Sequence, residues 1–147
     1  MTWKPGRGLL GPLKPLLGDW RYKGEHNGGP LVCTRRFEPF GKGWVRLDAI
    51  WDMPTFSYTE TAFFGAGEDG ALAFFSFTSD GKRSQGRLAD GSDVHAQAVA
   101  LEAQMPQGLA RFIYWPLEDG GPGFRFAVES RTKKGWNRFL LHEYRAA

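Results

Sequence analysis

The sequence predicts an all-β protein whose strands close into one antiparallel up-and-down barrel. Glycine-marked turns recur at short, regular intervals along the 147 residues. The segments between these turns alternate apolar and polar residues, and they are rich in Trp, Phe, Tyr, Val and Thr, which favour strands. Because closure removes the exposed edges of a sheet, about ten antiparallel strands joined by tight hairpins are expected to form a barrel.

The N-terminal segment predicts a short helical plug. A chain of this length suits one domain, with residues 1–17 as a leading segment and 18–147 as the barrel. Residues 7–17 carry leucines at helical spacing, but Pro12 and Pro15 limit any helix there to one or two turns. We expect these leucines to close one end of the barrel.

The first strand is expected at 19–27, where Trp20 and Tyr22 alternate with the charged Asp19 and Arg21. Turn signals at 28–29 and 41–43 precede the next two strands. Further strands are expected at 31–38, 44–53, 57–65 and 72–78. Turn signals at Asp80-Gly81, Asp90-Gly91, 106–108, 119–123 and 133–135 then bound the remaining strands, the last of which runs from Trp136 to Arg145.

Two strands carry doubled phenylalanines, Phe63-Phe64 and Phe74-Phe75. Successive side chains on a strand point to opposite faces, so one ring of each pair is expected outside the barrel. A neighbouring side chain, the leading helix or a second subunit would cover it. The sequence leaves these three possibilities open, and a homodimer is therefore one expected assembly.

Composition and charge exclude several classes. Lys and Arg number 19 against 16 Asp and Glu, and the two signs are interspersed, so a nucleic-acid-binding stripe is not expected. No apolar run of about 18 residues predicts a membrane-spanning helix. The lone Cys33 cannot form an internal disulfide and is expected to be a buried, inert thiol. With no signal-peptide pattern at the start, we expect a cytoplasmic protein.

A ten-stranded barrel is expected to hold a ligand. About eight strands is the size at which a barrel first encloses one small molecule, and ten leave more room. Inward faces rich in aromatic residues suit a small hydrophobic or aromatic guest. The residues expected to contact it are Trp51, Tyr58, Tyr114, Trp115, Phe126, Trp136, Arg138, His142 and Tyr144.

The last strand holds the most suggestive set of polar side chains. Under strict alternation, Arg138, His142 and Tyr144 share one face with Trp136, and Phe139 lies on the other. With the first face inward, a cation, an imidazole and a phenol would orient an anionic aromatic guest. With the second face inward, the same groups lie on the surface. The sequence leaves both arrangements open.

Catalytic and metal-binding patterns are weak. Glu60 could point inward together with Tyr58, and Arg35 could then be its partner, because one buried carboxylate is more often paired than catalytic. His26 and His95 are expected at the rim and on the surface. Three scattered histidines lack the spacing of a metal site, so neither a metal nor an enzymatic activity is predicted.

The two ends of the barrel region carry a family resemblance. Gly18-Asp19-Trp20 opens the first strand after a short apolar helix, and Glu143-Tyr144-Arg145 closes the last one. This layout resembles the lipocalin-like calycins, in which the Trp plugs the closed end and a basic residue packs across its ring. The resemblance implies structural roles for Gly18, Trp20 and Arg145, the last by a cation lying on an aromatic face.

The opening Gly18-Asp19-Trp20-Arg21-Tyr22-Lys23-Gly24 also resembles bacterial lipocalin-like proteins of unknown function and the ten-stranded, heme-binding nitrobindins. In nitrobindins a histidine near the C-terminus ligates the iron, and His142 is the nearest candidate. The resemblance thus implies an alternative function, heme-dependent chemistry with His142 as axial ligand. A further alternative is a dimeric interaction module whose barrel is filled by its own aromatic side chains.

Overall fold

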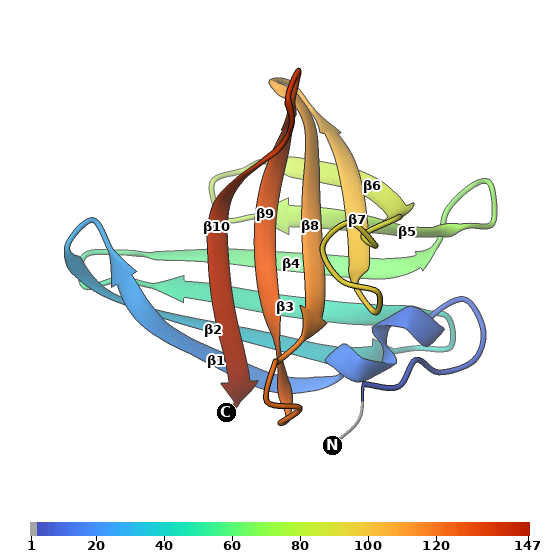
Figure 1. Cartoon of the computed structure of the whole chain (residues 1–147), viewed down its shortest axis with the longest axis horizontal. Coiled ribbons are helices and arrows are strands. Elements are labelled where there is room, and N and C mark those ends of the chain that lie inside the picture. The colour runs from blue at the N-terminus through green and yellow to red at the C-terminus, as the bar shows by residue number, and fades with distance from the viewer. Residues whose placement is uncertain (1–2) are drawn as a thin grey trace.

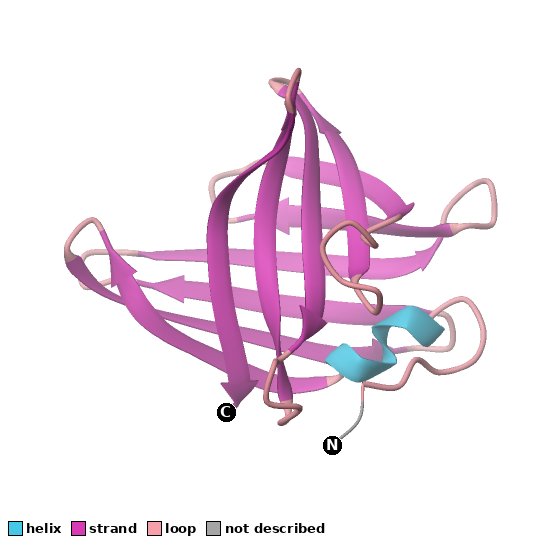
Figure 2. Ribbon diagram, in the orientation of Figure 1, coloured by secondary structure: helices cyan, strands magenta, loops and turns pink. Residues whose placement is uncertain are grey.

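The computed structural model describes residues 3–147 and shows a closed barrel of ten antiparallel strands (Figures 1 and 2). Each strand pairs with its neighbours in the chain, and β1 pairs with β10 to complete the ring. The predicted all-β, up-and-down barrel is therefore confirmed. The strands are β1 (Gly18–His26), β2 (Gly29–Phe40), β3 (Trp44–Asp52), β4 (Ser57–Ala66), β5 (Leu72–Thr78), β6 (Arg83–Ala89), β7 (Val99–Met105), β8 (Gly108–Pro116), β9 (Gly123–Thr132) and β10 (Gly135–Ala146).

The predicted N-terminal plug is a short 3-10 helix, η1 (Gly11–Leu16), which contains both prolines of the segment. Its Leu13 and Leu16 are fully buried and belong to the main core. The indole Nε1 of Trp20 donates a hydrogen bond to the backbone oxygen of Leu16 at 2.6 Å. This bond ties the helix to β1. Within residues 3–147, no helix is long and apolar enough to cross a membrane.

The ring of strands is joined unevenly. Most neighbouring strands are paired over much of their length, but the β1–β10 ladder contains only Trp20 with Ala146 and Arg21 with Arg145. Beyond these pairs the two strands diverge, as Figure 1 shows. We call this short ladder and the divergence beyond it the β1–β10 seam.

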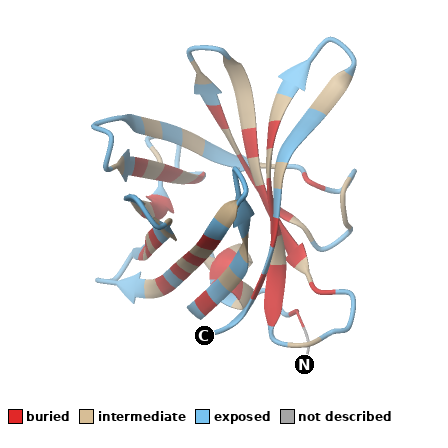
Figure 3. Ribbon diagram, turned by 90° about the vertical axis from the view of Figure 1, so that its left-hand side faces the viewer, coloured by how far each residue is buried: buried red, intermediate tan, exposed pale blue. Residues whose placement is uncertain are grey.

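Alternation along the strands separates the core from the surface, as the bands of burial in Figure 3 show. In β3, for example, Val45, Leu47 and Ala49 are buried, whereas Arg46 pairs with Asp48 on the outer face. Phe64 and Phe74 likewise lie in the core. Their sequence neighbours Phe63 and Phe75 lie outside, where the ring of Phe40 packs against Phe63 and that of Trp44 against Phe75. The prediction that one ring of each pair lies outside is confirmed.

A β-bulge interrupts the alternation of β10. Arg138 lies opposite Glu129, but Leu140 lies opposite Val128, so the intervening Phe139 is an extra residue. Because of this extra residue, Leu140, His142 and Tyr144 face the core while Arg138 faces outward. The prediction that Arg138 shares a face with His142 and Tyr144 is wrong for this reason.

Candidate ligand-binding site

The barrel contains a cavity of about 500 Å³ that opens between the turn ends of β5–β6 and β7–β8. Its mouth includes Lys82, Arg83, Gln107 and Phe139. In an up-and-down barrel these turns lie at the opposite end from the β2–β3 turn, against which η1 packs. The helix therefore closes one end of the barrel and leaves the other accessible.

The cavity walls are largely aromatic and aliphatic. Three residues predicted to contact a ligand, Trp51, Tyr58 and Phe126, line it. Phe112 and Val128 also line it and were not predicted. The alternation of β8 and β9 contained the necessary signal, since Phe112 shares a face with Tyr114, and Val128 shares one with Phe126.

Arg35 of β2 lies at the floor of this cavity. It lines both the main cavity and a small deeper void of about 20 Å³, which Tyr114 also lines. Arg35 is only 4% exposed, and its Nη2 donates a hydrogen bond to the phenol oxygen of Tyr114 at 2.7 Å. Burial raises the pKa of Tyr114 to about 12, against the opposing charge of Arg35, so the phenol stays protonated at neutral pH. The guanidinium carbon of Arg35 also lies 4.2 Å from the centre of the Phe126 ring.

Glu60 of β4 lies beside Arg35, as the sequence predicted. The nearest approach between the two, from Nη2 to Oε1, is 4.0 Å, which is at the limit of an ion pair. The other carboxylate oxygen of Glu60 accepts a hydrogen bond from the Ser76 hydroxyl at 2.5 Å. Ser76 thus holds the carboxylate at the edge of the Arg35 guanidinium.

His142 of β10 lies next to the cavity wall. Its ring stacks on Tyr22 of β1, with centroids 3.9 Å apart and planes 9° apart, and it lies 5.3 Å from the Trp51 ring. Gly24 makes room for this stack, because a Cβ there would overlap the Tyr22 ring. Burial, with a further effect of the Arg35 charge, lowers the pKa of His142 to about 4. The imidazole is therefore neutral at neutral pH.

Tyr144 and Cys33 complete the buried polar groups near Arg35. The phenol of Tyr144 is fully buried, and burial raises its pKa above the ordinary range. Burial also raises the pKa of Cys33 to about 11, so the thiol is protonated and buried as predicted. Of the residues predicted to contact a ligand, Tyr114 lines the small inner void, whereas Tyr144 and His142 are buried nearby and line neither the cavity nor the void.

The remaining predicted contacts lie outside the barrel. Arg138 bonds Glu129 there, Trp136 lies under the guanidinium of Arg111, and Trp115 belongs to a small outer core. The segment before β7 covers this outer core through Val94 and Ala98. These three predicted residues therefore cannot touch a molecule bound inside the barrel.

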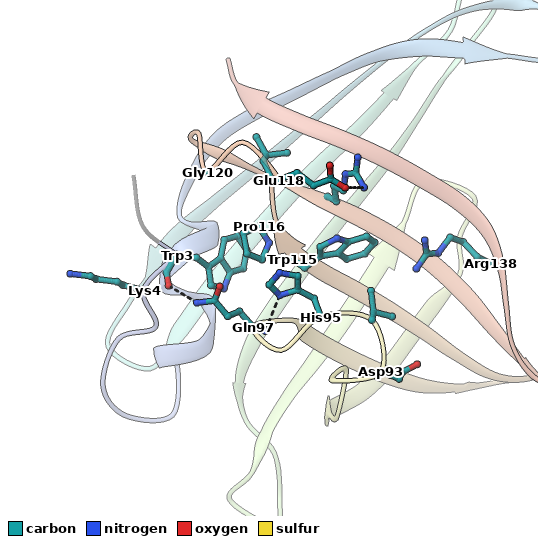
Figure 4. A pocket seen from close by; sticks show the side chains of 13 residues that line it. Trp3, Lys4, Asp93, His95, Gln97, Trp115, Pro116, Glu118, Gly120 and Arg138 are labelled. Carbon is teal, nitrogen blue, oxygen red and sulfur yellow. Dashed lines mark hydrogen bonds and ion pairs between the residues drawn. The ribbon is translucent and has the colours of Figure 1, made fainter.

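Trp115 and Arg138 instead line an outer groove of about 910 Å³, which Figure 4 shows from close by. Polar groups along the groove bond one another: the Gln97 side-chain amide donates to the backbone carbonyl of Trp3 at 3.4 Å, and the Arg125 side chain pairs with that of Glu118 at 3.4 Å. In residues 3–147, the buried side-chain polar atoms that lack a partner are Arg35 Nε, His142 Nδ1 and Tyr144 Oη. All three lie inside the barrel, and Arg35 lines its cavity, so the inner cavity is the stronger candidate site.

The family resemblance implied structural roles for Gly18, Trp20 and Arg145, and the structure agrees for the first two but not for Arg145. Trp20 is buried and packs edge to face on Phe124 at 5.4 Å, in agreement with a plug. Gly18, the first residue of β1, has a φ of +134°, which favours glycine. Arg145, however, points outward and bonds Asp119 at 3.0 Å. The predicted packing of Arg145 across Trp20 is wrong, because the inward position of Tyr144 places its neighbour outside.

Metal ligands do not gather in the described part of the chain. No group of three or more His, Cys, Asp or Glu side chains in residues 3–147 is arranged to hold a metal ion. His95 lies in the segment before β7, where its Nδ1 accepts a hydrogen bond from the backbone N–H of Gln97. His26 is exposed at the end of β1.

Comparison with known proteins identifies a shared fold. No protein-family model matches the chain, and no curated protein matches it in sequence. The crystal structure of Rv2717c from M. tuberculosis is similar, with a TM-score of 0.57 and 15% sequence identity, over 96% of this chain and 98% of that chain. The two proteins share a barrel fold. At this identity the likeness extends to the fold alone.

Proposed function

We propose that the protein binds a small hydrophobic or aromatic molecule inside the barrel. The observation that carries this proposal is the cavity of about 500 Å³, which has aromatic walls and is lined by the buried polar residues Arg35 and Ser76. Small-molecule sites typically combine a volume of roughly 300–1,000 Å³ with apolar walls and a few convergent polar groups. The same volume argues against the alternative of a barrel filled by its own side chains.

The neutral fluorescent amine N-phenyl-1-naphthylamine tests this proposal directly. We expect its fluorescence to rise on binding to the native protein. Ala110 of β8 lines the cavity, so Ala110→Phe should fill the space and abolish the rise. The matched control is Ala96→Phe, at an exposed position outside the cavity.

The outcomes separate a binding barrel from nonspecific adsorption. A saturable signal that Ala110→Phe removes and Ala96→Phe retains supports the proposal. No signal, or a signal that survives in Ala110→Phe, contradicts it. Native mass spectrometry of gently purified protein adds an independent readout, because a bound guest adds mass that disappears on denaturation.

We propose heme binding as a second candidate function, favoured by one observation at His142. Its Nδ1 is buried without a hydrogen-bond partner among the described residues, and its lowered pKa keeps the ring neutral, as a metal ligand requires. His142 would hold the iron through this nitrogen, and heme would supply the iron centre; the residue is 6% exposed and lies beside the cavity without lining it. Tyr22 and Trp51 are the aromatic neighbours of the His142 ring, and Trp51 also lines the cavity.

Addition of hemin to the purified protein tests this second candidate. Heme ligated by His142 should give a sharp Soret absorption band that His142→Ala shifts or removes. His26→Ala, at an exposed histidine, is the control. A titration that yields only the spectrum of free hemin would rule out this function and leave the first proposal intact.

A further inference from the structure

We infer that the molecule bound in the cavity carries an acidic group on its apolar body and that Arg35 holds this group. This inference rests on the proposed function and adds the chemical class of the ligand. It begins from the unusual position of Arg35, a 4% exposed guanidinium at the floor of the cavity. A buried charge of this kind is costly unless it is paired and hydrogen-bonded.

The protein itself uses little of the hydrogen-bonding capacity of Arg35. A guanidinium presents several N–H donors in a planar fork. Within residues 3–147 its side-chain hydrogen bond goes to Tyr114, and its buried Nε has no partner. Phe126 and Tyr144 lie close enough to attract the charge, but their rings do not replace the missing oxygen acceptors. The Nε itself is enclosed, but Arg35 lines the cavity, so its guanidinium is available there to a ligand that brings such an acceptor.

Glu60 does not remove this availability. Its closest oxygen is 4.0 Å from Arg35, and Ser76 binds the other oxygen at 2.5 Å. Charge-assisted bonds are strongest at about 2.7–2.9 Å, well inside the Arg35–Glu60 separation. Because Ser76 holds the Glu60 carboxylate at this distance, Glu60 neutralises the charge of Arg35 only weakly.

The charges that line the whole cavity favour an anion. They comprise four cationic side chains, Arg35, Lys82, Arg83 and Arg131, and one carboxylate, Glu60. The three outer cations lie toward the mouth, and Arg35 lies at the floor. Their excess positive charge attracts an acid into the barrel, and the apolar walls between them suit its body.

Two fluorescent probes with the same ring skeleton test the inference. One is neutral N-phenyl-1-naphthylamine, and the other is 8-anilino-1-naphthalenesulfonate, which adds one sulfonate. We expect the native protein to bind the sulfonate about tenfold more tightly, as one charge-assisted hydrogen bond allows. The measured quantity is the ratio of the two dissociation constants, obtained by fluorescence titration.

Variants of the floor residues assign the effect. Arg35→Met keeps an unbranched side chain at the floor but removes the guanidinium and its charge, and it should reduce the affinity ratio to about one. Glu60→Gln removes the competing negative charge and should raise the ratio about threefold or more. This second variant keeps the inference testable if Arg35→Met fails to fold. Arg21→Met, on the outer face of β1, is the matched control and should leave the ratio unchanged.

The outcomes distinguish the inference from the proposed function. Equal binding of both probes to the native protein overturns the inference and leaves the proposed function in place, whereas binding of neither overturns both. If Arg83→Met, at the mouth, removes the sulfonate preference and Glu60→Gln leaves the preference unchanged, the assignment to Arg35 is overturned. Competition by 2-naphthoate and by decanoate then separates aromatic from aliphatic acids. Displacement by either supports the inference, and displacement by neither contradicts it.

Discussion

The neutral, buried His142 makes the stability of the protein depend on pH. Its pKa is about 4 in the folded protein, whereas a histidine in an unfolded chain titrates near 6.5. Between these values the unfolded chain binds a proton that the folded protein does not, so stability is full above about pH 6.5 and falls as the pH drops toward 4. We expect a loss of up to about 1.4 kcal/mol per pH unit in this window.

Urea unfolding measured from pH 7.5 to 4 checks this expectation. His142→Phe preserves an aromatic ring against Tyr22 but cannot titrate, so its stability should fall less steeply than that of the native protein. His26→Gln, at an exposed position, should retain the native slope. Parallel pH profiles for native protein and His142→Phe would show that the proton uptake lies elsewhere.

Two buried tyrosines that differ by one hydroxyl contact provide a second residue-level prediction. The Tyr114 hydroxyl accepts the hydrogen bond of Arg35, whereas the Tyr144 hydroxyl is buried without a partner among the described residues. Tyr114→Phe should cost about 1–3 kcal/mol of unfolding free energy, because it leaves the buried guanidinium without its acceptor. Tyr144→Phe should change it by less than about 0.5 kcal/mol. Thermal unfolding of both variants measures the difference, and equal losses would contradict it.

Residue pairs on regular strands could be predicted from alternation alone. The inward Glu60 and its neighbour Arg35 were predicted in this way, and the structure places them together. Arg138 was misplaced because the bulge at Phe139 inserts one residue opposite Glu129. Such a bulge leaves no glycine or proline signal here, so the sequence alone does not reveal it.

At the scale of elements, an ion-pair network on the outer face joins three strands. Glu129 of β9 is 3% exposed and accepts bonds from Arg111 of β8 at 2.5 Å and from Arg138 of β10 at 2.8 Å. Arg111 also bonds Asp93, in the segment that covers the outer core. Glu129 thus joins β8, β9 and β10, and Arg111 connects them to that segment.

Removal of Glu129 should be strongly destabilising. Glu129→Ala leaves the buried Arg111 without one of its carboxylate partners, and we expect a loss of about 3–5 kcal/mol. Glu38→Ala breaks a solvent-exposed pair with Arg36 and should cost less than about 1 kcal/mol. Chemical denaturation of the two variants compares them. Similar losses would mean that Glu129 contributes no more than a surface charge.

The covered outer face of β7–β9 shows where element-level prediction ends. Alternation correctly assigns Ile113 and Trp115 to the face opposite Tyr114. It does not say what buries them, because the covering segment at 90–98 is a loop whose position depends on Arg111 and Asp93. Trp115 was predicted to contact a ligand together with its neighbour Tyr114, but adjacent residues on a strand point to opposite faces, and Trp115 lies in the outer core.

At the scale of the whole molecule, one outer face carries an aromatic cluster, made of Phe40, Phe63, Trp44 and Phe75. Phe40 is 46% exposed, and Phe77, on the same strand as Phe75, is 51% exposed. Exposed aromatic patches often mark association surfaces. We expect a second copy of the chain to pair through this face.

Sedimentation analysis of Phe63→Glu and Phe75→Glu tests this assembly. Each variant should be a folded monomer under conditions in which the native protein is a dimer, because a charge in the interface costs more than it does in water. Leu88→Glu, at an exposed position on β6 outside the aromatic cluster, is the control and should remain dimeric. A monomeric native protein would refute the predicted dimer.

The β1–β10 seam has a consequence for how the barrel forms. Its two residue pairs join the first strand to the last, so they require the longest chain closure in the fold, whereas hairpins link every other pair of neighbouring strands. Long closures carry the largest entropic cost and contribute most to slow folding. We therefore expect the nine hairpin ladders to form first and the ring to close last. In the native state the same joint is the least costly to open, so transient opening there would expose His142 and Tyr22 while the rest of the sheet stays intact.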